Sequence, residues 1–338
     1  MANVQKQFEK FDEKIKLRRL QENATLTEKR DRVLRTLRDG LERIRREGKK
    51  IPKFRTFNQG SYEIGVGVKP LDGDYDIDVG VAFELARGEH DPVAVKQWVL
   101  EAVEGHTARV EMRRSCVTVF YQAAGEPMYH VDLAVYADGP QNEGKMYLAR
   151  GKLNSSPENR EWSPSDPEGL TAAINDRFEG DDAKQFRRVI RAGKRWKDHR
   201  FANDGHAAPR GIALAVAAFH WFIPATRIVD GQTVRDDSQA VRNFVATMLR
   251  NFNQRLVVRC PVEPFDDLCS RMSDVQMGAF KAKLEALLNA LRDADLDADP
   301  HTACKTLARE FGDDFPIPEP EETAKPQRRA ITSSGSSG

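Results

Sequence analysis

The sequence predicts an α+β protein with a mixed-sheet core, a C-terminal helical domain and a long N-terminal spine helix. Short alternating apolar runs bounded by Gly and Pro favour strands in the first half of the chain. Apolar residues at helical spacing dominate before and after that region. A hydrophobic content of 40% in 338 residues supports a core of this size. We therefore expect N-terminal helices at 1–50, the core at 51–165, the helical domain at 166–315 and a disordered tail at 316–338.

Helical periodicity accounts for most of the expected elements outside the core. The N-terminal segment predicts helices at about 4–20 and 26–48, and a capping box is expected at Thr25 to Glu28. One long strand is expected at 109–121. The remaining helices are expected near 91–104, 181–199, 211–222, 238–253, 274–292 and 301–311.

Composition excludes several classes of protein. The net charge of +1 gives no general signal for nucleic-acid binding. The four cysteines match neither a zinc spacing nor a dense disulfide framework, which fits a reducing cytosol. The charged first 20 residues do not resemble a signal peptide, and no apolar run reaches the roughly 18 residues of a membrane span. We therefore expect a cytoplasmic protein without a membrane partner.

Three aspartates alternate along one predicted strand. Asp74, Asp76 and Asp78 project from one face, because side chains repeat with a period of two. Adjacent carboxylates raise one another's pKa, so a bound cation stabilises such a row. Hard oxygen ligands suit Mg²⁺. A solvated edge strand or a simple turn is the alternative interpretation.

A lone acid on a second strand extends this pattern. Asp132 alternates with apolar residues in a short buried run, where an unpaired carboxylate is costly. A salt-bridged aspartate is one interpretation, and a third metal ligand is the better one beside Asp76 and Asp78. We expect His130 to point to the opposite face as a packed or capped histidine.

A basic stripe marks the helix expected at 181–199. Arg187, Arg191 and Lys194 share one face, where like charges repel unless an anion lies across them. A triphosphate would suit this stripe. A solvated cationic face is the alternative.

Taken in order, these motifs resemble the polymerase-β-like nucleotidyltransferases and, within them, the DncV branch of the bacterial cGAS/DncV-like nucleotidyltransferases (CD-NTases). The resemblance covers roughly residues 25–225. The sequence departs from it at Pro209 to Ile212, where a serine is expected. The matching segments are Asn58 to Tyr62, Asp74 to Asp78, Tyr129 to Asp132, Trp162 to Pro167 and Gly193 to Trp196.

The resemblance implies a site and a reaction. Asp76, Asp78 and Asp132 would be the catalytic residues and would hold two Mg²⁺ ions, with Mn²⁺ as an alternative. Asp74 shares their strand face, but we expect it to hydrogen-bond to the metal ligands or to cap the loop rather than to bind metal. The product would be a cyclic dinucleotide made from ATP and/or GTP with release of pyrophosphate, in antiphage (CBASS) signalling. Nucleotide binding would fall to Gln59, Gly60, Ser61, Tyr62, Arg191 and Lys194, with Tyr62 either stacking on a base or packing.

Two other functions remain open at this point. A linear nucleotidyltransferase acting on RNA or protein would use the same three aspartates, although the near-neutral charge argues against a nucleic-acid substrate. An inactive nucleotide- or partner-binding scaffold is the other alternative. The complete triad argues against it.

The last residues, Ser333 to Gly338, have two interpretations. They are either a Ser-Gly remnant of cloning or a native tail. In the second case the resemblance implies a ubiquitin-like conjugation enzyme (E1/E2-like) as partner. Gly338 would then be the conjugation point, since a Pro/Ser/Gly segment gives reach and Gly338 adds no side-chain bulk.

Overall fold

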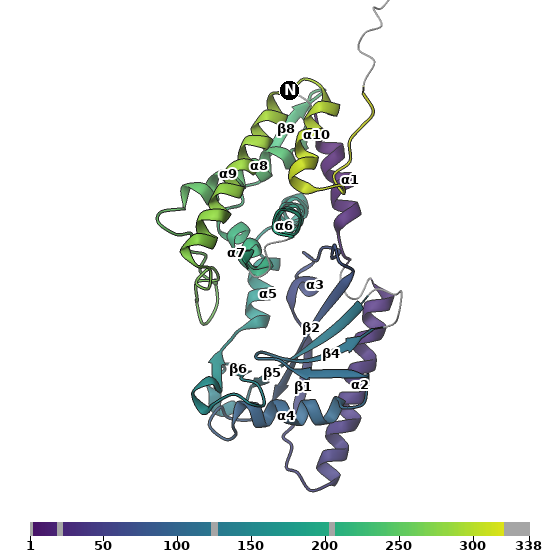
Figure 1. Ribbon diagram of the computed structural model, residues 1–338, viewed down its shortest axis with the longest axis vertical. Coiled ribbons are helices and arrows are strands. Elements are labelled where there is room, and N and C mark those ends of the chain that lie inside the picture. Colours follow the sequence, from purple (N-terminus) through teal and green to yellow (C-terminus); the bar gives the residue numbers. More distant parts are fainter. Residues whose placement is uncertain (1–2, 19–22, 123–127, 203–206, 321–338) are drawn as a thin grey trace, which may run out of the picture.

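The computed structural model describes residues 3–18, 23–122, 128–202 and 207–320. Two bodies lie one above the other along the long axis, a sheet domain and a helical body (Figure 1). The predicted conjugation point Gly338 and most of the predicted tail lie outside the described residues.

A seven-stranded mixed sheet forms the lower body. Its main path runs β1-β2-β5-β4-β3, and only the central β2–β5 pair is parallel. β6 pairs with the end of β5, and β7 pairs with β6. The α+β prediction is confirmed. The strands are β1 (Phe54–Asn58), β2 (Asp74–Phe83), β3 (Arg109–Met112), β4 (Val117–Tyr121), β5 (Met128–Ala137), β6 (Tyr147–Arg150) and β7 (Glu161–Pro164).

Residues 109–121 form two strands where one was predicted. β3 and β4 pair with each other in antiparallel register. The chain reverses between them, where the Arg113 amide donates to the Cys116 carbonyl over 2.9 Å. This turn contains no glycine or proline, so the sequence pattern gave no reason to divide the run.

Two helices cover one face of the sheet, α2 (Ala24–Arg46) and α4 (Pro92–Val103). The side chain of Asn23 caps α2 by accepting from the Leu26 amide, so the helix begins earlier than the predicted capping box implies. Apolar residues of both helices pack on the odd-numbered residues of β2 and β5. The even-numbered residues, which include the aspartates, therefore face away from this core.

The helical body has its own continuous core. This body also contains a short antiparallel hairpin, β8 (Thr226–Val229) and β9 (Gln232–Arg235), which was not predicted from the sequence. The helices of the body that follow the sheet in the chain are α5 (Pro167–Asn175), α6 (Gly180–Arg200), α7 (Gly211–Trp221), α8 (Asp237–Arg250), α9 (Asp274–Leu296) and α10 (Pro300–Phe311).

The two N-terminal helices belong to different cores. α1 (Gln5–Ile15) packs in the helical body, where the rings of Phe8 and Phe11 each lie 5.1 Å from that of Phe315. α2 packs on the sheet. The N-terminal segment therefore spans both bodies, as Figure 1 shows.

The four cysteines, all in the described part of the chain, are buried and free. Among the described helices, we find none that is both long and apolar enough to cross a membrane.

Candidate active site

The parallel pairing of β2 and β5 assembles the acidic residues. Asp76 is level with His130 in the register, and Asp78 is level with Asp132. Level residues of parallel strands project from the same face, so all four side chains point away from the core under α2 and α4. One ligand atom each from Asp76, His130 and Asp132 lies within 4.8 Å of the others. This donor set fits a divalent cation.

The expectation that His130 faces away from Asp132 is wrong. The two residues are two positions apart on β5, so the period of the strand places them on the same face. His130 Nδ1 lies 2.9 Å from Asp74 Oδ1, and Nε2 lies 3.1 Å from Asp76 Oδ1. Burial lowers the pKa of His130, but the hydrogen bonds and charges of Asp76 and Asp74 outweigh burial and raise it to about 9.

Asp132 is held from the neighbouring strand. Thr118 on β4 is level with it in the register, is fully buried, and donates its hydroxyl to Asp132 Oδ1 over 2.5 Å. Burial and then the charge of Asp76 raise the pKa of Asp132. The Thr118 hydrogen bond fixes the orientation of the carboxylate and lowers its pKa, but burial and Asp76 outweigh that effect.

Asp78 lies against the short helix α3 (Gly60–Ile64). A Cβ built on Gly60 would lie 2.0 Å from Asp78 Oδ2, and Gly60 has a φ of +76°. Both facts require glycine at the start of this helix. Burial, then the charges of Asp76 and Asp132, raise the pKa of Asp78 well above its usual value.

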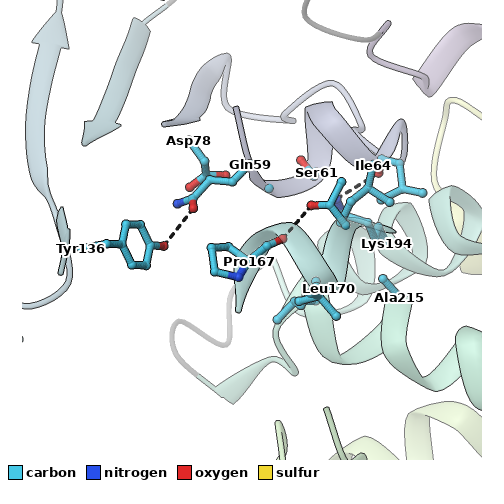
Figure 2. A pocket seen from close by; sticks show the side chains of 14 residues that line it. Gln59, Ser61, Ile64, Asp78, Tyr136, Pro167, Leu170, Lys194 and Ala215 are labelled. Carbon is cyan, nitrogen blue, oxygen red and sulfur yellow. Dashed lines mark hydrogen bonds between the residues drawn. The ribbon is translucent and has the colours of Figure 1, made fainter. Parts of the chain in front are cut away.

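A cavity of about 360 Å³ opens beside Asp78, between the sheet and the helical body (Figure 2). One wall comes from α3 and the residues on either side of it, β2 and β5, and the other comes from α5, α6 and α7. The lining residues are Gln59, Gly60, Ser61, Ile64, Val66, Asp78, Tyr136, Pro167, Leu170, Thr171, Lys194, Gly211, Ile212 and Ala215.

Lys194 is the cation of this cavity wall. Its Nζ donates to the Val66 carbonyl over 3.0 Å, which ties α6 to the loop after α3. A Cβ on Gly211 would lie 3.1 Å from Lys194 Cε, so the glycine leaves room for the lysine chain. Burial lowers the pKa of Lys194 to about 8. An anion in the cavity would stabilise its charged form.

Two predicted nucleotide-binding residues lie elsewhere. Tyr62 is only 5% exposed and belongs to the core under the sheet. Arg191 is bidentate to Asp12 on α1, at 2.6 and 2.9 Å, and donates to the Gly65 carbonyl over 2.8 Å. Its guanidinium thus joins α6 to α1 and to Gly65, the residue that follows α3.

Sequence reasoning missed several contributors to the site, of which Tyr136, Thr118 and Leu170 are examples. Tyr136 lines the cavity and donates its hydroxyl to Gln59 Oε1 over 2.8 Å (Figure 2). Thr118 orients Asp132, and Leu170 lines the cavity from α5. The even spacing of His130, Asp132 and Tyr136 along β5 was the available signal for Tyr136. The contributions of β4 and α5 depend on pairing and packing that the local pattern does not specify.

The structure has the features of a nucleotidyltransferase fold. Carboxylates project from one face of two neighbouring central strands, a Gly-Ser turn lies beside them, and a helical body lies across the cavity. Residues 52–136 match the family described as "Cyclic GMP-AMP synthase DncV-like, nucleotidyltransferase domain". Over these residues the chain is similar to the nucleotidyltransferase domain of the bacterial DncV-like enzymes. The resemblance found in the sequence motifs is confirmed.

Solved structures share the fold over nearly the whole chain. The Vibrio cholerae DncV cyclic AMP-GMP synthase has a TM-score of 0.69 at 16% identity, covering 94% of this chain and 98% of that one. CdnG of Bradyrhizobium diazoefficiens, in complex with GTP, has a TM-score of 0.68 at 17% identity, covering 92% and 96%. Escherichia coli DncV, bound to 3'-deoxy GTP, has a TM-score of 0.67 at 18% identity, covering 89% and 93%.

Proposed function

We propose that this protein joins nucleoside triphosphates, ATP and/or GTP, into a cyclic dinucleotide and releases pyrophosphate. The observation that carries the proposal is the position of Asp76, Asp78 and Asp132 on one sheet face, with a cavity at Asp78. Ser61 and Lys194 line that cavity from opposite bodies. A triphosphate in it would meet the Ser61 hydroxyl and the Asp78 carboxylate on the sheet side and the Lys194 cation on the helical side.

The residues divide the chemical work. Ser61 supplies a hydroxyl donor to the phosphates, and Lys194 neutralises negative charge that develops on them. Asp132, oriented by Thr118, accepts the proton of the attacking ribose hydroxyl. Divalent cations held by Asp76, Asp78 and Asp132 would lower the pKa of that hydroxyl and neutralise the leaving pyrophosphate.

The base has a place in the same cavity. Ile64, Leu170 and Ile212 give it an apolar wall, which suits the face of a nucleobase. Gln59, held by Tyr136, offers an amide beside that wall. One related structure, of Vibrio cholerae DncV, contains the linear intermediate 5' pppA(3',5')pG. Two successive transfers through such an intermediate would close a ring here, for a role in antiphage signalling.

Product analysis tests the proposal. The full chain is incubated with mixed labelled nucleoside triphosphates and Mg²⁺ or Mn²⁺, then treated with phosphatase and separated by chromatography. A cyclic product keeps its label through phosphatase treatment. A linear product loses its terminal phosphates, which would support the linear transferase instead. No product beyond the background of an Asp76→Asn variant would contradict both and favour a scaffold.

A further inference from the structure

We propose that His130 is itself a metal ligand, oriented by Asp74, and that it makes this site prefer Mn²⁺ to Mg²⁺. The inference rests on the proposed function, since it concerns the metal site of that reaction. It adds a nitrogen ligand to the carboxylates that the sequence predicts and gives Asp74 a defined role.

The positions of the two ring nitrogens support this assignment. Nε2 of His130 faces Asp76 at 3.1 Å, and a ring nitrogen of His130 lies within 4.8 Å of carboxylate oxygens of both Asp76 and Asp132. Nδ1 points the other way and contacts Asp74 at 2.9 Å. The imidazole therefore lies between Asp76 on one side and Asp74, at the start of β2, on the other.

This is the arrangement that metal-binding histidines use. A ligating histidine almost always donates its second ring N–H to a carboxylate, a carbonyl or water, which fixes the tautomer and the ring orientation. With Asp74 accepting from Nδ1, the lone pair of Nε2 is left for the cation. Coordination requires an unprotonated Nε2, so metal binding releases any proton on that nitrogen to solvent.

The ligand set determines the preference among cations. Mg²⁺ selects oxygen ligands in strict octahedral geometry and gains little from an imidazole. Mn²⁺ accepts the carboxylates of Asp76 and Asp132 as Mg²⁺ does, and as a first-row transition metal it gains more than Mg²⁺ from a nitrogen ligand, although less than the later metals of the series. His130 should therefore raise affinity for Mn²⁺ more than affinity for Mg²⁺.

The alternative role of His130 is electrostatic. A protonated imidazole between Asp74 and Asp76 would neutralise their charge in the metal-free protein, and a cation would displace it from Asp76. The two roles differ in one observable, which is direct bonding between nitrogen and the bound metal.

Pulsed EPR of the Mn²⁺-loaded protein measures that bond. The full-length protein is stripped with chelator and loaded with about one equivalent of Mn²⁺ without nucleotide, and ¹⁴N modulation of the electron spin echo is recorded. Wild type should show imidazole ¹⁴N coupling, and His130→Gln should not. The control His220→Gln, whose residue contacts the Arg259 carbonyl away from the site, should retain it.

Titration of Mn²⁺ and Mg²⁺ gives the second readout. His130→Gln should weaken Mn²⁺ binding by at least about tenfold and Mg²⁺ binding by less, and Asp74→Asn should weaken Mn²⁺ binding while the ¹⁴N coupling remains. Absence of ¹⁴N coupling in the wild type would overturn the inference. If cyclic product still forms in that case, the proposed function stands alone. Coupling without any product would instead contradict the proposed function.

Discussion

The carboxylate of Asp78 occupies the space that a side chain on Gly60 would need. A Cβ at residue 60 would lie 2.0 Å from Asp78 Oδ2. The strand aspartate and the Gly-Ser turn therefore require each other, although 18 positions separate them in the sequence. The turn places Ser61 beside the acidic face of the sheet because residue 60 carries no side chain that would collide with Asp78.

Gly60→Ala should displace Asp78 or the turn and abolish nucleotidyl transfer. It should also destabilise the fold by more than the roughly 1–2 kcal/mol that a left-handed backbone costs an alanine. Gly105→Ala is the matched control. Gly105 has the same φ of +76° with no atom within 4 Å of a built Cβ, so it carries the backbone cost alone. Thermal unfolding and turnover of both variants measure the difference, and equal losses would contradict the steric account.

Asp76→Asn combined with Asp78→Asn should abolish turnover and raise the melting temperature of the metal-free protein. The raised pKa of Asp78 has burial as its largest cause, followed by repulsion from Asp76 and Asp132. The folded state therefore holds a proton that the unfolded state releases above the ordinary aspartate pKa of 3.8. Wild-type stability without metal should fall as pH rises from that value through the raised pKa of the folded state, and the variant should show a flatter dependence. Substantial product from the variant would refute the assignment.

Lys194→Ala should weaken nucleoside triphosphate binding by about 1–3 kcal/mol, the cost of a lost charge-assisted contact. Calorimetry of the wild type and the variant measures it. Arg188, although on another face of α6, is unsuitable as a control, because it pairs with buried Asp237 at 2.6 and 2.9 Å. Lys184→Ala is the suitable control, since that side chain is 69% exposed on the same helix. Equal weakening by both variants would mean that α6 presents only a general cationic surface.

Arg191→Ala should affect stability far more than nucleotide affinity. It leaves the buried carboxylate of Asp12 without its partner, a change that typically costs about 3–5 kcal/mol. Arg191→Met with Asp12→Leu should recover much of that loss, because it removes both charges together. Chemical denaturation and nucleotide titration separate the two effects. A large loss of nucleotide affinity in the folded double variant would contradict this prediction and indicate that Arg191 contacts the nucleotide.

Local pattern was sufficient for much of this fold and site. Alternation placed Asp76, Asp78 and Asp132 on strand faces, and helical spacing located α2 and α6 within a few residues. The same alternation, applied to β5, would have placed His130 beside Asp132.

The contacts that the sequence pattern did not predict depend on pairing between residues far apart in the chain. The Thr118 bond to Asp132 depends on the β4–β5 register, and the Arg191 bond to Asp12 depends on docking of α1 against α6. The sequence of a basic helix does not reveal which of its basic residues forms an ion pair with a carboxylate far away in the chain. Lys194 and Arg191 are three residues apart, yet one lines the cavity and the other holds the N-terminal helix.

The proposed reaction requires the carboxylate of Asp132 to act in the chemical step rather than in direct contact with the nucleotide. Single-turnover transfer and equilibrium binding, measured on the same preparation of Asp132→Asn, separate these two roles. We expect nucleotide affinity within about threefold of wild type, since Ser61 and Lys194 are intact, and transfer slowed by at least about a hundredfold. Transfer by Asp132→Asn at a rate comparable with wild type would show that this carboxylate takes no part in the chemistry.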